Sequence, residues 1–262
     1  MPHKNAKRRN LLPPTKIFIR VLLYYLLVTG YSLGVNIKQL KDFALETSSI
    51  ARRIYGMKLI LGGGQSDAAR WFFFNREKLK YKINFKSNGL ILDIGSYVGE
   101  YTKKLIDKNP RMTFWLYEPI PEYYRACLVR FKDQENVSVY QKAVSADGRD
   151  IRMQIDGLRS RQELNTNDEV LEFASINIQE IFDSVSEIEL LKMNIEGMEY
   201  ECLNQLILSN SLIKANHLLI QFHNFENEAE KKRNLVIKAI EEDFTNVFTF
   251  EWIWELWIRK GK

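Results

Sequence analysis

The chain has 262 residues, 45% of them apolar and 27% charged, so it is long enough for one sizeable domain and too apolar for general disorder. Its net charge is +5, but six of its 38 lysines and arginines lie in residues 1–20, which contain no acidic residue. The remainder is close to neutral, which argues against a nucleic-acid-binding face on the domain. Cys127 and Cys202 lack metal-ligand spacing and are expected to be buried free thiols in a reducing compartment.

Residues 1–35 combine this basic arm with an apolar stretch over 17–35. Arg20 interrupts the stretch, and small residues make its end less apolar. Its apolar centre is therefore shorter than the roughly 20 residues that a membrane span needs. A span with the basic arm in the cytoplasm would also export the rest of the chain. We expect a helix lying at the membrane interface, while a helix packed on protein and a true span stay open. The protein is then cytoplasmic, with peripheral attachment to the cytoplasmic membrane face as one alternative.

Residues 36–88 are predicted to form a helical cap. Apolar residues recur near helical spacing over 36–60, and Gly62–Gly64 mark a hinge. Ser66 and Asp67 resemble the start of a second helix, which is expected to run through about residue 78. No Gly-Lys-Ser/Thr follows the three glycines, which excludes a phosphate-binding loop there.

From residue 89 to residue 262 the pattern is a regular alternation of strands and helices. Strands are expected at 90–94, 113–117, 137–144, 150–155, 189–195 and 218–222, helices at about 99–108, 121–132, 198–208 and 226–243, and two strands or a bent hairpin over 247–259. This alternation predicts a parallel sheet with helices on both faces. Ligands bind such a sheet at the carboxyl ends of its strands.

The first strand ends in Asp93 and continues into a glycine-containing turn. Gly95 and Gly99 permit a tight turn and the close approach of a ligand. Amide groups at the following helix start can bind a carboxylate, and Asp93 can bind an ammonium group. The Gly-x-x-x-Gly spacing differs from the Gly-x-Gly-x-x-Gly of dinucleotide sites, which favours a nucleoside without phosphates.

Three further strand ends carry polar side chains. Glu118 ends the next strand and can accept hydrogen bonds from both hydroxyls of a ribose, although a solvated loop acid is the alternative. Asn194 and Glu196 follow the strand at 189–195 and are expected to face the reactive end of the cofactor. His223 follows the strand at 218–222 and can exchange a proton near neutral pH, although a lone histidine is more often structural.

These segments occur in the order "LILDIGSYVGEYT", "FWLYEPIPEYYRACL", "VYQKAVSADGRDIRM", "ELLKMNIEGMEYECL" and "LLIQFHNF". In this order they resemble the FkbM family of methyltransferases over roughly residues 88–258. The resemblance implies a class I, Rossmann-like α/β fold, with a mostly parallel seven-stranded sheet whose last strand is antiparallel, after a helical N-terminal region. It also implies methyl transfer from S-adenosylmethionine to a hydroxyl of a small-molecule or glycan acceptor, with no nucleic-acid partner.

The resemblance also assigns roles to residues. It implies that Asp93, Gly95 and Gly99 hold the methionine part of the cofactor, that Glu118 holds the ribose, and that Ala143 and Val144 lie by the adenine. Ser96, Tyr97 and Pro119 complete the predicted cofactor-binding residues. The catalytic candidates are Asn194, Glu196 and His223, and no metal site is predicted.

Two positions depart from the family pattern. The family usually has Asp where Asn194 stands and Glu where Gln221 stands, and an amide cannot act as a general base. Glu196 and His223 thereby become the better candidates for proton removal. A non-catalytic, membrane-associated scaffold that keeps the fold stays open, and so does an NAD-dependent oxidoreductase, which the missing third glycine disfavours. Loops 156–175 and 223–232 are expected to shape the acceptor pocket.

Overall fold

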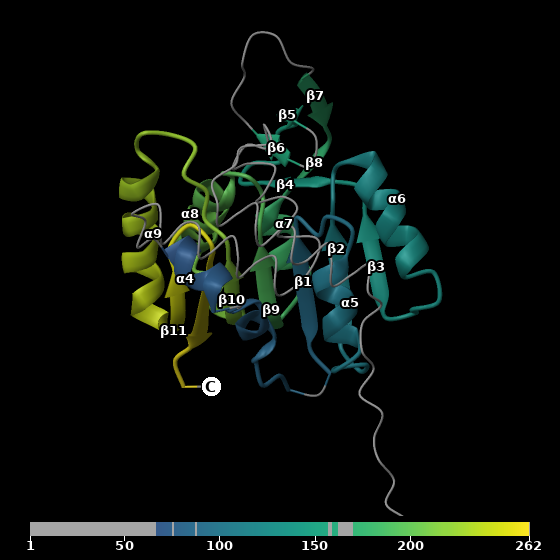
Figure 1. Ribbon diagram of the computed structural model, residues 1–262, viewed down its shortest axis with the longest axis horizontal. Coiled ribbons are helices and arrows are strands. Elements are labelled where there is room, and N and C mark those ends of the chain that lie inside the picture. Colours follow the sequence, from purple (N-terminus) through teal and green to yellow (C-terminus); the bar gives the residue numbers. More distant parts are fainter. Residues whose placement is uncertain (1–66, 75, 87, 157–158, 162–169, 262) are drawn as a thin grey trace, which may run out of the picture. The chain divides into compact units, whose positions relative to one another are not determined.

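The computed structural model describes residues 67–261, apart from 75, 87, 157–158 and 162–169 (Figure 1). The chain divides between Glu77 and Lys78 into two units. The arm at 1–35, the helix expected within 36–60 and the hinge at 62–64 lie outside the described residues. Within the described ranges, no helix has both the length and the apolar character that a membrane span requires.

In the first unit, α4 spans Asp67–Phe73. It ends earlier than the predicted helix, which was expected to reach about residue 78, and a 3-10 helix, η1, follows over Arg76–Tyr81. Three consecutive aromatic residues, 71–73, close α4, and a fourth, Phe74, follows it. Aromatic side chains lose rotamer freedom in a helix, so this end of the segment has little intrinsic tendency to continue.

The second unit is built on a seven-stranded sheet with the order β11-β12-β10-β9-β1-β2-β3 (Figure 1). Its strands are β1 (Leu90–Ile94), β2 (Thr113–Tyr117), β3 (Val137–Tyr140), β9 (Ile188–Met193), β10 (Ala215–Ile220), β11 (Phe244–Phe250) and β12 (Trp254–Arg259). Only β12 among these seven runs against its neighbours, and the other adjacent pairs are parallel. The predicted sheet, with its antiparallel last strand, is confirmed.

Helices cover both faces of this sheet. They are α5 (Glu100–Ile106), α6 (Pro121–Arg130), α7 (Ile178–Asp183), α8 (Glu199–Leu208) and α9 (Ala229–Asp243), with a short 3-10 helix, η2, at Leu212–Lys214. Successive residues of a strand point to opposite faces. Leu92 and Ile94 of β1 join an apolar core to which α7, α8 and α9 contribute. Asp93, between them, points to the other face and meets Thr102 of α5.

The segment 137–144 was expected to be one strand, and this expectation is wrong. β3 ends at Tyr140, and a separate strand, β4 (Ala143–Ser145), pairs in parallel with β8 (Ser175–Asn177) in a second sheet. The neighbouring strand β2 explains the break. Glu118 N still donates to Tyr140 O at 3.1 Å, but the next amide on that side, Ile120 N, donates to Glu118 Oε1 at 3.0 Å and does not extend the ladder.

A third, antiparallel sheet follows β4. It consists of β5 (Ile151–Asp156), β6 (Arg159–Arg161) and β7 (Val170–Phe173), in the order β6-β5-β7. The excursion predicted at 150–155 corresponds to β5, whereas β6, β7, β8 and α7 were not predicted. The added strands lie beyond the carboxyl ends of the central strands, at the top of Figure 1. They extend the unit on the side where ligands of parallel sheets bind.

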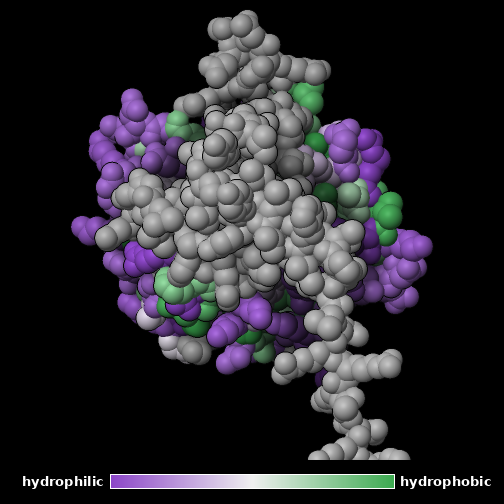
Figure 2. All heavy atoms as spheres, in the orientation of Figure 1, coloured by the Kyte–Doolittle hydropathy of each residue, from purple (hydrophilic) through white to green (hydrophobic). Residues whose placement is uncertain are grey.

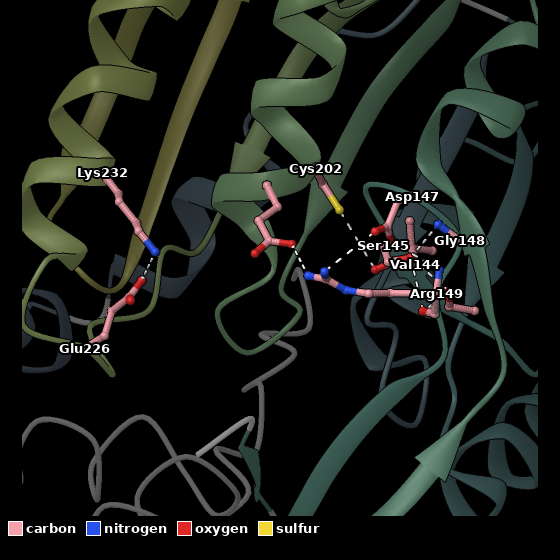
Figure 3. Close-up of polar contacts among 10 residues, drawn as sticks. Val144, Ser145, Asp147, Gly148, Arg149, Cys202, Glu226 and Lys232 are labelled. Carbon is pink, nitrogen blue, oxygen red and sulfur yellow. Dashed lines mark hydrogen bonds and ion pairs between the residues drawn. The ribbon is translucent and has the colours of Figure 1, made fainter. Parts of the chain in front are cut away.

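The turn between β4 and β5 is tied to α8 by polar contacts (Figure 3). Ser145 Oγ accepts a hydrogen bond from Gly148 N at 2.9 Å, and Arg149 Nη2 lies 2.7 Å from Glu201 Oε2. The side chains of Arg149 and Glu201 are 59% and 49% exposed. An exposed ion pair of this kind stabilises a fold by only about 0–1 kcal/mol, so it orients the turn without anchoring it strongly.

The surface is mostly hydrophilic on the face that Figure 2 shows. Purple residues dominate both lateral margins of the described part, and green apolar residues form small separate areas. The exposed large apolar side chains include Val129 on α6, Leu208 on α8 and Leu235 on α9, each on a different helix. Cys127 and Cys202 are buried free thiols, as predicted.

Gly95 directly follows β1 and has a φ of 75°. A Cβ atom there would lie 1.9 Å from the backbone oxygen of Asn194. Gly261 has nearly the same φ, 76°, but no atom lies within 4 Å of a Cβ built on it. The two glycines therefore separate the cost of a left-handed backbone from the cost of a clash.

We expect Gly95→Ala to lower the free energy of unfolding by more than about 3 kcal/mol, because left-handed strain of about 1–2 kcal/mol adds to a backbone clash. Gly261→Ala should show the strain alone. Denaturant unfolding of both variants measures the difference, and equal losses would contradict this account of Gly95.

Candidate cofactor-binding and active site

Three central strands end side by side at one edge of the sheet. Ile94 of β1 pairs with Met193 of β9, which pairs with Ile220 of β10. The next residues stay in step, since Asn194 N donates to Ile94 O and Gln221 N donates to Met193 O, each at 3.0 Å. The turn after β1, the loop after β9 and the loop after β10 therefore lie on the same edge, as expected for a ligand site of this sheet.

The turn after β1 is fixed to the end of β2. Gly95 N and Ser96 N both donate to Tyr117 O, at 2.9 and 3.2 Å. Tyr97 follows with a φ of 53°, a left-handed conformation that is strained for a residue with a side chain. Gly99 has no room for a side chain, because a Cβ there would lie 2.5 Å from the ring of Phe131. The two glycines are thus required by close contacts within the protein itself.

Glu118 joins the loops that follow β1 and β2. Its Oε2 accepts a hydrogen bond from Tyr97 N at 2.8 Å, and its Oε1 accepts one from Ile120 N at 3.0 Å. Only 4% of the residue is exposed. Burial raises the pKa of Glu118 to about 7, although both amides and the Lys192 charge act in the opposite direction. Pro119, beside it, is half-buried.

Asp93 is fully buried and engaged by protein groups. Its Oδ1 lies 2.8 Å from Lys192 Nζ, and its Oδ2 accepts a hydrogen bond from Thr102 Oγ1 at 2.6 Å. Lys192 also donates to Gly95 O at 2.6 Å, so one ammonium group holds the end of β1 and its turn together. Asp93 is therefore paired with an ammonium group of the chain itself, and its contact with the cofactor stays a prediction.

His223 lies between two carboxylates. Its Nδ1 is 2.9 Å from Glu199 Oε1, and its Nε2 is 3.5 Å from Glu196 Oε2. His223 is 9% exposed, the Glu199 side chain 0% and the Glu196 side chain 24%. The loop after β9 thus brings the catalytic candidates Glu196 and His223 together, at an imidazole that can hold a proton next to a negative charge.

Asn194 and Gln221 stand at the ends of β9 and β10, at the positions where the sequence departs from the family pattern. The Asn194 side-chain oxygen is buried and has no hydrogen-bond partner among the described residues. A buried amide oxygen without a partner is costly, and it fits a ligand that donates a hydrogen bond. Gln221 is half-buried.

The predicted adenine neighbours lie in the second sheet. Ala143 and Val144 are buried in β4, where Ala143 N donates to Ala174 O at 3.0 Å and Val144 O lies 3.9 Å from Cys202 Sγ (Figure 3). Of the loops expected to shape the acceptor pocket, 156–175 is described only in part. In 223–232, Lys232 pairs with Glu226 at 2.7 Å.

Sequence reasoning missed two buried residues of this edge, Lys192 and Glu199. A lysine inside the mostly apolar strand Ile188–Met193 was the signal for Lys192, since a charged residue in a fully buried strand needs a partner. The signal for Glu199 was its position three residues after Glu196, at the start of α8. Neither signal identifies the residues that Lys192 and Glu199 contact. No group of His, Cys, Asp and Glu side chains in the described ranges is arranged to hold a metal ion.

The sequence matches the model of the FkbM methyltransferase domain over residues 93–254, more than half of the chain. The chain belongs to the FkbM methyltransferase family. Members of this family depend on S-adenosylmethionine as the methyl donor. No curated protein gives a significant match to the sequence.

Similar solved structures include other methyltransferases. An FkbM methyltransferase from Methylobacillus flagellatus KT is 15% identical, with a TM-score of 0.45, and the match covers 85% of this chain but only 58% of that one. TrmK of M. capricolum with bound S-adenosylhomocysteine is 13% identical over 72% and 69% of the two chains, with a TM-score of 0.41. A fibrillarin from Methanococcus jannaschii is 14% identical over 69% and 71%, with a TM-score of 0.41.

Lys192→Met should lower the free energy of unfolding by about 3–5 kcal/mol, because it leaves the buried Asp93 carboxylate without its counter-ion. Lys103→Met is the matched control, since Lys103 and Asp107 form an ion pair of the same 2.8 Å length that is largely exposed. Its loss should cost at most about 1 kcal/mol. Chemical denaturation measures both. Similar losses would show that the buried pair has no special weight, and adding Asp93→Asn to Lys192→Met should recover part of the stability.

Proposed function

We propose that this protein transfers a methyl group from S-adenosylmethionine to a hydroxyl group of a sugar, a glycan, a glycolipid or a similar metabolite. The observation that carries the proposal is the position of His223. Its imidazole lies beside Glu196 and Glu199, on the same sheet edge as the Gly95 turn. A hydroxyl must lose its proton on methylation, and an imidazole is well suited to take a proton near neutral pH.

The residues present fit the cofactor. Glu118 offers a buried carboxylate whose oxygens each accept one backbone amide and retain capacity for a ribose hydroxyl. The unpartnered oxygen of Asn194 fits the ammonium group of the methionine part, which Asp93 cannot readily take while Lys192 and Thr102 occupy it. Bound S-adenosylmethionine supplies a methyl group that is already activated by its sulfonium. The protein then needs to bind, to align and to remove one proton.

Asn194 and Gln221 motivate the alternative of a non-catalytic, membrane-associated scaffold. The proposed proton acceptor is His223, so an amide at either position is compatible with catalysis. The reading as an NAD-dependent oxidoreductase is disfavoured by the spacing of Gly95 and Gly99. Titration with S-adenosylhomocysteine and with NAD separates the methyltransferase from the oxidoreductase, and tight binding of NAD alone would contradict the proposal.

The location and the acceptor are parts of the same proposal. We propose a cytoplasmic enzyme that attaches peripherally to the membrane surface through residues 1–35. Support comes from the basic arm and the apolar stretch at 17–35. A membrane-attached enzyme would meet glycolipid acceptors at the surface, which is the reason to include lipids among the substrates tested.

Glu118 makes a pH dependence measurable. Its pKa of about 7 means that the carboxylate is ionised at pH 8 and largely protonated at pH 6. Charge-assisted hydrogen bonds to ribose hydroxyls are the stronger ones, so affinity should fall as the pH decreases. We expect the Kd for S-adenosylhomocysteine to rise about tenfold from pH 8 to pH 6. Calorimetric titration of Glu118→Ala should give weak binding without this dependence, and a parallel pH dependence in the variant would remove Glu118 from the explanation.

His223 provides the test of the reaction. The full-length protein is incubated with labelled S-adenosylmethionine and with glycan or lipid extracts, and the label in the extracts is measured. We expect His223→Gln to lower turnover at least about 100-fold, the usual contribution of a general base, with the Kd for S-adenosylhomocysteine changed less than twofold. His217→Gln, which alters the buried histidine of β10, is the control. Absence of label from every extract with the wild-type protein would favour the scaffold.

A further inference from the structure

Glu199 accepts hydrogen bonds from two backbone amides and also faces His223. Its Oε1 accepts a hydrogen bond from Ile195 N at 2.7 Å and lies 2.9 Å from His223 Nδ1, and its Oε2 accepts one from Gly197 N at 2.9 Å. The side chain is completely buried. Because both oxygens already accept backbone amides, the group acts as an acceptor, which favours a proton on the histidine nitrogen that faces it.

We propose that Glu199 is the positioning residue for His223: it fixes the imidazole with its proton on Nδ1, so that Nε2 is the atom that takes the acceptor's proton. This inference rests on the proposed function and names how the same site would work. Nε2 is the nitrogen on the side of Glu196, whose partly exposed carboxylate is 3.5 Å away. An imidazolium formed there would lie between two carboxylates, which favour its charge.

The proton balance of the reaction is simple. When a hydroxyl oxygen gains a methyl group, an O–C bond forms and the S–C electron pair stays on sulfur. The O–H bond breaks at the same time, and its proton passes to Nε2 of His223. Release of that proton to water restores the neutral ring, so one turn of the reaction requires no other reagent.

The backbone of His223 is held independently of Glu199. Tyr200 Oη donates to His223 O at 2.6 Å, and the ring of Phe225 lies 5.0 Å from the imidazole. Glu199 therefore adds the orientation and tautomer of the ring. The loop between β9 and α8, which leads into Glu199, is strained, since Glu196 has a φ of 55°. Strain of this kind persists where surrounding contacts fix it, and it is frequent at active sites.

Nitrogen-15 NMR of histidine-labelled full-length protein tests the proposal without cofactor or acceptor. The chain has three histidines, so His→Gln variants assign every imidazole signal. We expect His223 in the Nδ1–H form in the wild type and a shift toward the Nε2–H form in Glu199→Gln. His217 is the internal reference, because its Nδ1 faces the backbone oxygen of Glu189 at 2.9 Å and should stay protonated in both.

Glu201→Gln is the matched control, since Glu201 lies on the same helix and pairs with Arg149. It should leave the His223 signals unchanged. If the His217 signals of Glu199→Gln show a disturbed fold, Glu199→Asp is measured instead, which keeps the charge and should keep the Nδ1–H form.

A wild-type His223 protonated on Nε2, or a tautomer unaffected by Glu199→Gln, would overturn the inference and leave the proposed methyl transfer standing. Calorimetry with S-adenosylhomocysteine completes the test. The Kd of Glu199→Gln should stay within twofold of the wild type, and a large loss would assign Glu199 to the cofactor site instead of to His223.

Discussion

The buried ion pair between Lys192 and Asp93 is the contact on which the geometry of the ligand edge depends. Removing two charges from water costs several kcal/mol for each ion, and the cost is offset only where other polar groups complete the site. Here Thr102 Oγ1 donates a hydrogen bond to Asp93, and Gly95 O accepts one from Lys192. Because one ammonium group reaches both the strand and its turn, the register of β9 against β1 also sets the turn that follows β1. A shift of one residue would break both polar contacts that Lys192 makes.

The sequence predicts which residues lie at the ligand edge, but it does not predict which of them contact one another. Glu118, Asn194 and His223 are placed correctly at strand ends, because the alternation of strands and helices determines which end of a parallel sheet collects the loops. Periodicity also indicates that Lys192 lies in a buried strand. It does not indicate which distant strand supplies the partner, so the pairing with Asp93 emerges only when β9 is laid beside β1.

Similar limits explain the other differences. The segment 137–144 has the composition of one strand. It divides because the next amide of the neighbouring loop, Ile120 N, donates to Glu118 and not to the ladder, which is a property of another part of the chain. Glu118, Glu196 and Glu199 are chemically identical in the sequence. Their exposures and partners differ because loop geometry buries two of them against backbone amides and leaves the third partly in solvent.

The two left-handed residues of this edge that are not glycine, Tyr97 and Glu196, share one further feature. The strained turn at Tyr97 is held by Glu118, and the strained loop at Glu196 is held by Glu199 through the neighbouring amide of Gly197. Each loop is thus held by a glutamate of the chain, whose carboxyl group accepts hydrogen bonds from backbone amides. These amides are not available to an anion of a ligand. The edge is consequently preorganised, because contacts within the protein hold its loops before a ligand binds. Binding should therefore cost little loop ordering, and it should favour ligand groups that donate hydrogen bonds.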